Sequence, residues 1–104
     1  MLGAGNVIAC DIDRDAAGIA AHGIPGLVFI GSVDAVRGHH ADIVIANINP
    51  AVVESLAGEF ARVSRSREST LILSGFREDN ALAGYAPERI STRDGWACWI
   101  CRPN

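Results

Sequence analysis

Residues 41–50, A-D-I-V-I-A-N-I-N-P, constrain the fold of this chain most. Residues 43–46 are apolar and mostly β-branched, without alternation, which predicts a strand buried on both faces, as in a parallel sheet flanked by helices. The abrupt change to N-I-N-P marks the carboxyl end of that strand, where open α/β sheets place their ligands. We expect Asn49 to cap a following helix and Pro50 to occupy its first position. Because Asn49 and Pro50 serve the start of the helix, Asn47 is the polar residue at the strand tip that we expect to be functional.

The rest of the chain alternates short apolar runs with helical and polar segments. Asp13 is placed to cap a helix, and Val53, Phe60 and Val63 recur at helical spacing. Asp94-Gly95 is a strong hairpin signal, and the strand after it is apolar on both alternations, so we expect that strand inside the sheet. The expected elements are strands at 6–12, 27–30, 42–46, 70–74, 89–93 and 96–102, and helices at 14–21, 50–63 and 77–85.

This order of elements predicts an α/β fold with a doubly wound, mostly parallel sheet and a C-terminal antiparallel hairpin. The length of 104 residues favours one domain, spanning 1–104, with a moderate core. A hydrophobic content of 49% is typical of a globular chain and not of a disordered one.

Charge and composition exclude several classes of protein. Nine Lys+Arg and twelve Asp+Glu give a net charge of −3, so no basic field points to nucleic acid, and no direct nucleic-acid partner is expected. The apolar runs are far shorter than the ~20 residues that a membrane span needs, and no signal peptide is recognisable. Three cysteines are an odd number, which favours a reduced protein in the cytoplasm.

The Cys98-x-x-Cys101 pair is the one pattern that suggests a metal or redox site. Residues three apart on a strand face opposite sides, so the two sulfur atoms are not expected to converge. A second Cys pair, which a structural zinc site needs, is missing from the sequence. We therefore predict no metal site.

Five motifs in sequence order point to a known family: V-I-A-C-D-I-D at 7–13, F-I-G-S-V at 29–33, A-D-I-V-I-A-N-I at 41–48, L-I-L-S-G-F at 71–76 and D-G-W-A-C-W-I at 94–100. Together they resemble the class I S-adenosylmethionine-dependent methyltransferases. The likeness is greatest to the bacterial enzymes that modify the eleventh protein of the large ribosomal subunit. It covers nearly the whole chain but only the later part of that family's catalytic domain. It implies methyl transfer from S-adenosylmethionine to lysine or N-terminal amines of a ribosomal protein.

The resemblance also implies which residues hold the cofactor. Asp11, with its neighbour Ile12, matches the acidic position that accepts hydrogen bonds from the two ribose hydroxyls, a task suited to carboxylate oxygens. Gly31, Ser32 and Val33 match the loop that lies against the adenine, where a glycine lets the backbone approach closely. From the residues alone, a solvated aspartate at a strand end and a plain turn explain the same positions.

Asn47 matches the asparagine that faces the substrate in this family. Its side-chain carbonyl can accept a hydrogen bond from an amine and orient the nitrogen lone pair toward the methyl donor, a contribution through positioning. The alternative is that Asn47 only satisfies backbone groups in a turn. The methyltransferase interpretation requires Asp11 and Asn47, at the tips of two parallel strands, to face the same crevice.

The family's first strand and its glycine-rich loop have no counterpart here. Residues 2–5, L-G-A-G, precede a strand, whereas a cofactor-binding glycine loop follows one and opens a helix. We therefore expect a truncated domain that binds the cofactor weakly or not at all alone. Without the first strand, the strands that start near Val7 and Asp42 must pair directly, accept a strand from another chain, which would make a homo-oligomer, or leave unpaired backbone groups. The second hypothesis is a non-catalytic methyltransferase-like remnant that serves as an interaction module.

Overall fold

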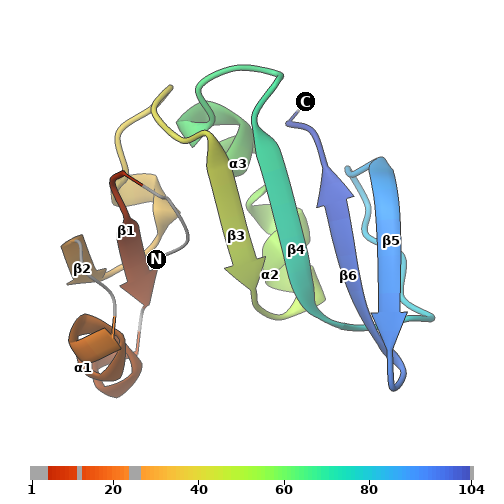
Figure 1. The fold of residues 1–104 in the computed structure, drawn as a ribbon, viewed down its shortest axis with the longest axis horizontal. Coiled ribbons are helices and arrows are strands. Elements are labelled where there is room, and N and C mark those ends of the chain that lie inside the picture. The colour runs from red at the N-terminus through yellow and green to blue at the C-terminus, as the bar shows by residue number, and fades with distance from the viewer. Residues whose placement is uncertain (1–4, 12, 24–26, 104) are drawn as a thin grey trace. The chain divides into compact units, whose positions relative to one another are not determined.

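A computed structural model describes residues 5–11, 13–23 and 27–103 (Figure 1). The chain divides into two compact units, Met1–Val36 and Arg37–Asn104, and each is described by itself.

The first unit contains a two-stranded parallel sheet. Ile8 lies opposite Leu27 and Asp11 opposite Ile30, so both strands end at the same edge. The elements are β1 (Ile8–Asp11), α1 (Arg14–Gly23), β2 (Leu27–Ile30) and the 3-10 helix η1 (Val33–Ala35).

The start of α1 follows from a local cap. The Asp13 carboxylate accepts hydrogen bonds from the backbone N–H groups of Asp15, at 2.9 Å, and Ala16, at 3.4 Å. These are two of the N–H groups that a helix leaves without a partner in its first turn. The predicted cap is confirmed.

The second unit is a four-stranded open sheet in the order β3-β4-β6-β5 (Figure 1). β3 runs parallel to β4, whereas β6 is antiparallel to both of its neighbours. The last strand therefore lies inside the sheet, as predicted, but only one of the strand pairs in this sheet is parallel. The elements are β3 (Ile43–Asn47), α2 (Pro50–Ser55), α3 (Ala57–Val63), β4 (Thr70–Arg77), β5 (Pro87–Arg93) and β6 (Trp96–Cys101).

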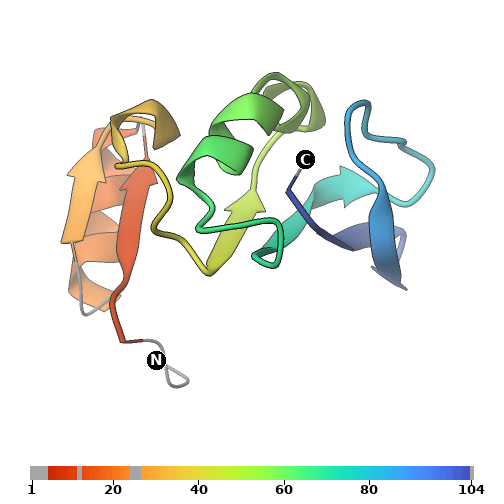
Figure 2. The same cartoon turned by 90° about the horizontal axis from the view of Figure 1, so that it is seen from above.

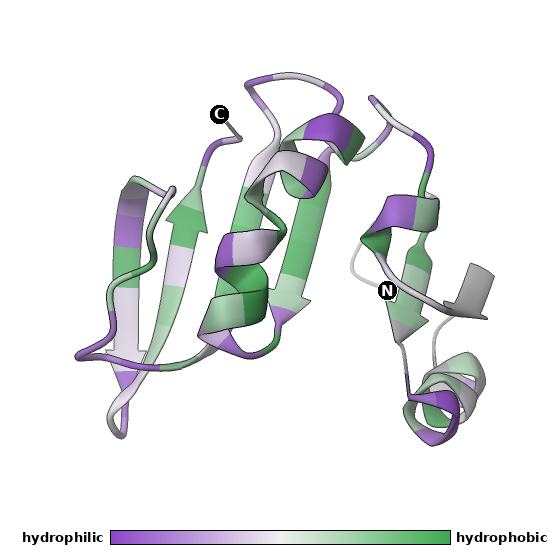
Figure 3. Ribbon diagram, turned by 180° about the vertical axis from the view of Figure 1, so that it is seen from behind, coloured by the Kyte–Doolittle hydropathy of each residue, from purple (hydrophilic) through white to green (hydrophobic). Residues whose placement is uncertain are grey.

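The two helices of this unit connect β3 to β4 and cover one face of these strands (Figures 1 and 2). Hydrophobic residues run along both strands (Figure 3). Alternation along β4 and β6 sends every second side chain toward this covered face. Phe76 and Trp99 meet edge to face, with ring centres 5.8 Å apart. The core consists of Val53, Phe60, Val63, Leu71, Leu73, Phe76, Leu82, Ala97, Trp99 and Cys101, with Ala46 at its border.

β3 is not buried on both faces, which corrects the prediction for this strand. Ile43 is 59% exposed and Ile45 70% exposed, whereas Ala46 is buried. Because α2 and α3 lie on the same face, the side chains that alternate to the other face stay accessible. An apolar run without alternation therefore does not show by itself that a strand is buried on both faces. In the part of the chain that the structure describes, one face of β3 is uncovered.

The chain after Gly75 also differs from the prediction. Gly75 does not end its strand; the register shifts between Ser74 and Phe76, so β4 continues through a bulge to Arg77. The helix expected at 77–85 is absent, because the residues between β4 and β5 form turns. Tertiary contacts hold this segment, including the buried side chain of Leu82 and a 2.6 Å hydrogen bond from the Tyr85 hydroxyl to the Val53 carbonyl.

The helix expected at 50–63 forms as two helices. Leu56, with φ −98° and ψ 6°, interrupts it between α2 and α3. Its beginning is as predicted, since Pro50 is the first helical residue and the Asn49 side chain accepts a 2.8 Å hydrogen bond from the Ala51 N–H. No described helix is long and apolar enough to span a bilayer.

Candidate functional site

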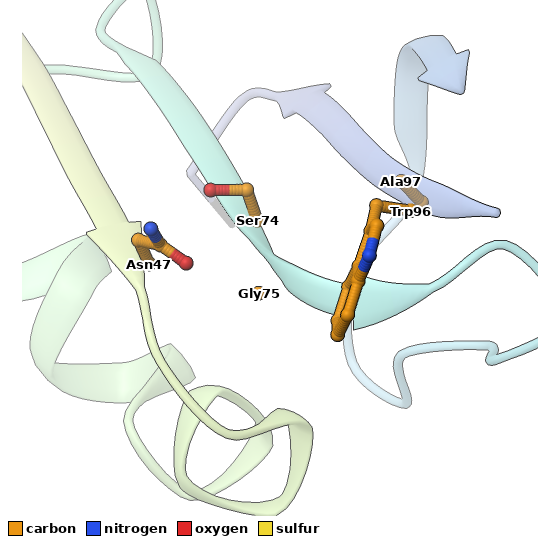
Figure 4. Close-up of a pocket in the computed structure, with 5 residues that line it drawn as sticks. All are labelled: Asn47, Ser74, Gly75, Trp96 and Ala97. Carbon is orange, nitrogen blue, oxygen red and sulfur yellow. The ribbon is translucent and has the colours of Figure 1, made fainter. Parts of the chain in front are cut away.

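A pocket opens in the second unit, where β3 ends and the bulge of β4 begins (Figure 4). Its lining contains an amide, a hydroxyl and an indole beside two small residues. The lining residues are Asn47, Ser74, Gly75, Trp96 and Ala97. This is the carboxyl end of the parallel pair of strands, the edge at which open α/β sheets place ligands.

Strand register brings Asn47 to this edge. Asn47 lies opposite Ser74, and the next residue, Ile48, donates its N–H to the Ser74 carbonyl at 3.3 Å. Gly75 has φ +96°, and a Cβ at this position would stand 2.7 Å from Oδ1 of Asn47 and 2.9 Å from the Ile48 carbonyl. The side-chain carbonyl of Asn47 therefore lies directly against the backbone of Gly75, an approach that only glycine permits.

The hairpin brings Trp96 to the same pocket. Asp94 (φ 52°) and Gly95 (φ 82°) form the tight turn that the sequence predicts, and Trp96 is the first residue of β6. In the sheet Trp96 lies opposite Arg77 of β4, and its side chain is 52% exposed. Figure 4 shows Asn47 and Trp96 on opposite sides of Gly75, with the indole seen edge-on.

The polar groups of the pocket are available to a ligand. Among the described residues, no hydrogen bond involves the side chains of Asn47 or Ser74, or the indole N–H of Trp96. The part of the chain that the structure describes contributes no ionisable side chain to the pocket lining. The site therefore offers an amide, a hydroxyl, an indole donor and a ring face, which suit a small polar group on an apolar stem. It can position such a group by hydrogen bonds and shape, but its lining supplies no general acid or base.

This geometry bears on the two interpretations of Asn47. The alternative from the sequence was that its amide satisfies backbone groups in a turn. In the described structure it is the Asn49 side chain that makes such a bond, to the Ala51 N–H. Asn47 has no comparable turn contact within the same part of the chain, so its amide remains directed to the pocket (Figure 4).

The residues predicted to hold the cofactor lie in the first unit. Asp11 is the last residue of β1 and Gly31 directly follows β2, so the parallel pairing places them at the same end of this sheet. Ser32 precedes η1 without capping it through its side chain, and Val33 is buried. Ile12 lies outside the described residues. Asn47 belongs to the second unit.

Of the lining residues, sequence reasoning found only Asn47 and missed Ser74, Gly75, Trp96 and Ala97. Ser-Gly after the apolar run at 70–73 was a usable signal, because the end of a strand parallel to β3 must come to the same edge. Trp96 was harder to find, since its place depends on the insertion of β6 beside β4.

The cysteines and the one tyrosine do not form a second site. Cys98 is half-buried and Cys101 buried, three residues apart on β6 and thus on opposite faces, as predicted. Burial, followed by the charges of Glu88 and Cys98, raises the pKa of Cys101 to about 11, so this thiol stays protonated near neutral pH. Burial likewise raises the pKa of Tyr85 to about 12. Within the described ranges, no group of three His, Cys, Asp or Glu side chains could hold a metal ion.

Comparison with known proteins adds no assignment. No model of a known protein family matches the chain, and neither does any curated protein.

Proposed function

We propose that this chain is a methyltransferase domain that uses S-adenosylmethionine to methylate an amine of a protein, with a ribosomal protein as the substrate that the resemblance implies. The observation that carries the proposal is the amide of Asn47. It stands at the carboxyl end of a parallel strand pair, without an internal hydrogen bond among the described residues, in a pocket walled by an indole. An amine on an alkyl chain fits these groups, because the amide oxygen accepts its N–H and the ring packs on its methylenes.

The strand arrangement supports the same proposal. The resembled family ends in a hairpin whose last strand inserts antiparallel beside the strand before the hairpin. The order β3-β4-β6-β5, with β6 antiparallel to β4, follows this pattern. In the first unit, the shared end of β1 and β2 carries Asp11 and Gly31, the positions at which the family binds ribose and adenine.

The proposed chemistry needs positioning more than acid–base catalysis. Asp11 would hold the ribose and the backbone of Gly31 to Val33 would lie along the adenine. Bound S-adenosylmethionine supplies a methyl group on a positively charged sulfur. Asn47 would accept one N–H of the amine and so direct the nitrogen lone pair at that methyl carbon. Transfer to this nitrogen would form a C–N bond as the C–S bond breaks with its electron pair kept on sulfur, and the nitrogen would then lose a proton to water.

Calorimetry with S-adenosylhomocysteine, together with a methyl-transfer assay on a lysine peptide, tests the proposal. We expect binding weaker than micromolar, because the family's first strand and glycine-rich loop have no counterpart in this sequence. We expect Asn47→Ala to lower transfer about ten- to a hundred-fold without changing cofactor affinity. Asp11→Ala is expected to weaken cofactor binding instead. NMR shifts of the Gly31 and Asn47 amides on adding S-adenosylhomocysteine show whether both respond to one ligand. A chain that neither binds this ligand nor transfers methyl groups would overturn the proposal.

A second candidate is a non-catalytic interaction module, and the exposed Ile43 and Ile45 favour it. The occupant we consider is a second copy of this chain. β3 carries no charge, so its edge can meet itself across a two-fold axis, whereas β5, the other edge, carries the charged residues Glu88, Arg89 and Arg93, which oppose edge-to-edge pairing. Sedimentation showing a dimer that Ile45→Lys dissociates, with no cofactor binding, would favour this function. A monomer at high concentration would exclude it.

A further inference from the structure

Arg77 packs directly against the tryptophan of the pocket. Its Cζ lies 4.9 Å from the centre of the Trp96 ring, within the range of a cation–π contact. A Cβ at Gly95 would come within 2.8 Å of the same Cζ, so the guanidinium occupies the space that any larger residue in the turn would fill. Arg77 makes no ion pair with an acidic side chain in the described structure. Its side chain is therefore committed to the indole and the turn.

Strand pairing and the hairpin turn hold the backbone around Trp96. Arg77 can therefore affect only the orientation of the indole ring. Trp96 pairs with Arg77 on one side and with Arg93 on the other. The Glu78 N–H donates to the Gly95 carbonyl at 2.9 Å, which ties the hairpin turn to the end of β4. With half of its surface exposed, the indole has room for other rotamers. An exposed cation–π contact favours the stacked rotamer about two- to five-fold.

We propose that Arg77 is a positioning residue for the pocket: it holds the indole of Trp96 in place as a wall. The inference depends on the proposed function and specifies its substrate further. Among the described lining residues Gly75 and Ala97 are small, so the flat ring of Trp96 is the largest apolar surface that a ligand can pack against. A flat apolar wall of this kind suits the methylene chain of a lysine side chain.

Arg77→Ala, compared with Arg93→Ala, tests this role. Both variants remove one exposed arginine next to Trp96 in the sheet, but only Arg77 stacks on the ring. The probes are Nα-acetyl-lysine methylamide and the indole N–H resonance of Trp96, assigned with Trp96→Phe. We expect Arg77→Ala to shift and broaden this resonance and to weaken amine binding about two- to five-fold. Arg93→Ala should do neither, and Arg77→Lys should restore part of the affinity.

The direction of the change in amine affinity distinguishes a positioning role of Arg77 from an effect of its charge alone. Removing a cation near the site relieves repulsion toward an ammonium ion, so a charge effect alone would strengthen binding. In the transfer assay, Arg77→Ala should raise KM for the amine and leave the S-adenosylhomocysteine affinity unchanged. Unchanged indole resonance and amine affinity, or equal effects of the two arginine variants, would refute the inference. If the wild type binds no S-adenosylhomocysteine but Arg77→Ala still weakens amine binding, the methyltransferase proposal fails and the role of Arg77 stands.

Discussion

At the scale of single residues, Gly75 serves both the bulge of β4 and the placement of Asn47. Its φ of +96° is a backbone conformation that residues with a side chain rarely adopt. An added Cβ would also stand only 2.7 Å from Oδ1 of Asn47. We expect Gly75→Ala to lower the free energy of unfolding by about 1–3 kcal/mol and to displace the Asn47 amide. Urea denaturation measures the first effect, and the NMR shift of the Asn47 side-chain amide the second.

Gly58→Ala is the matched control for this change. Gly58 lies in α3, and a Cβ there would meet nothing within 4 Å. Because alanine favours helix, this variant should be more stable than the wild type by about 0.5–1 kcal/mol. If the two glycine variants destabilised the protein equally, the contact between Gly75 and Asn47 would not be the cause.

The buried thiol of Cys101 and the half-buried phenol of Tyr85 predict how stability depends on alkaline pH. Burial raises the pKa of Cys101 from 9.0 to about 11 and that of Tyr85 from 10.0 to about 12, with nearby charges adding to both. Between the unfolded and the folded pKa of each group, the group ionises only in the unfolded chain. Ionisation stabilises the unfolded chain there, so the free energy of unfolding falls. Stability is thus full below pH 9 and falls as the pH rises through the two windows.

Urea unfolding at a series of pH values measures this loss. Cys101→Ala should flatten the decline between pH 9 and 11, and Tyr85→Phe the decline between pH 10 and 12. Cys98→Ala removes a thiol but keeps Cys101, and because burial is the largest cause of the shift, most of the decline should remain. A profile that Cys101→Ala leaves as steep as before would contradict the assignment.

At the scale of elements, two asparagines near the end of β3 have separable roles. Asn49 caps α2 through its 2.8 Å hydrogen bond to the Ala51 N–H, whereas Asn47 faces the pocket. Asn49→Ala should therefore lower stability by about 1 kcal/mol, while Asn47→Ala should leave it nearly unchanged. Thermal and urea unfolding of both variants test this difference. A comparable loss in Asn47→Ala would show that its amide stabilises the fold.

The elements that the sequence predicts well are those that local contacts decide. The caps at Asp13 and Asn49 and the turn at Asp94-Gly95 each depend on a few neighbouring residues, and all three form as expected. The segment between β4 and β5 does not form the predicted helix, because its conformation depends on the packing of Leu82 and on the hydrogen bond from Tyr85 to the distant Val53 carbonyl. The same distinction holds in the site. Asn47 follows from its place after an apolar run, whereas Trp96 reaches the pocket only through the pairing of β6 with β4.

At the scale of the whole molecule, the two units differ in the interactions that stabilise each of them internally. β4 and β6 have a hydrogen-bonded strand on each side, and their buried side chains form a large part of the described core of the second unit. The first unit has one pair of four-residue strands, and such a pair has little stability of its own. Amides of β4 and β6 should therefore exchange with solvent only through global unfolding, and amides of β1 and β2 through smaller openings.

Leu73→Ala tests whether these stabilities are separate. Leu73 is fully buried in β4, so the cavity should lower the protection of β4 and β6 amides by about 2–5 kcal/mol. If β1 and β2 open by themselves, their exchange rates should not change, since their openings leave the core around Leu73 intact. Hydrogen exchange followed residue by residue by NMR measures both sets at once. An equal loss of protection in β1 would mean that the chain unfolds as one cooperative structure, because a cavity in β4 can reach β1 only if both melt in the same step.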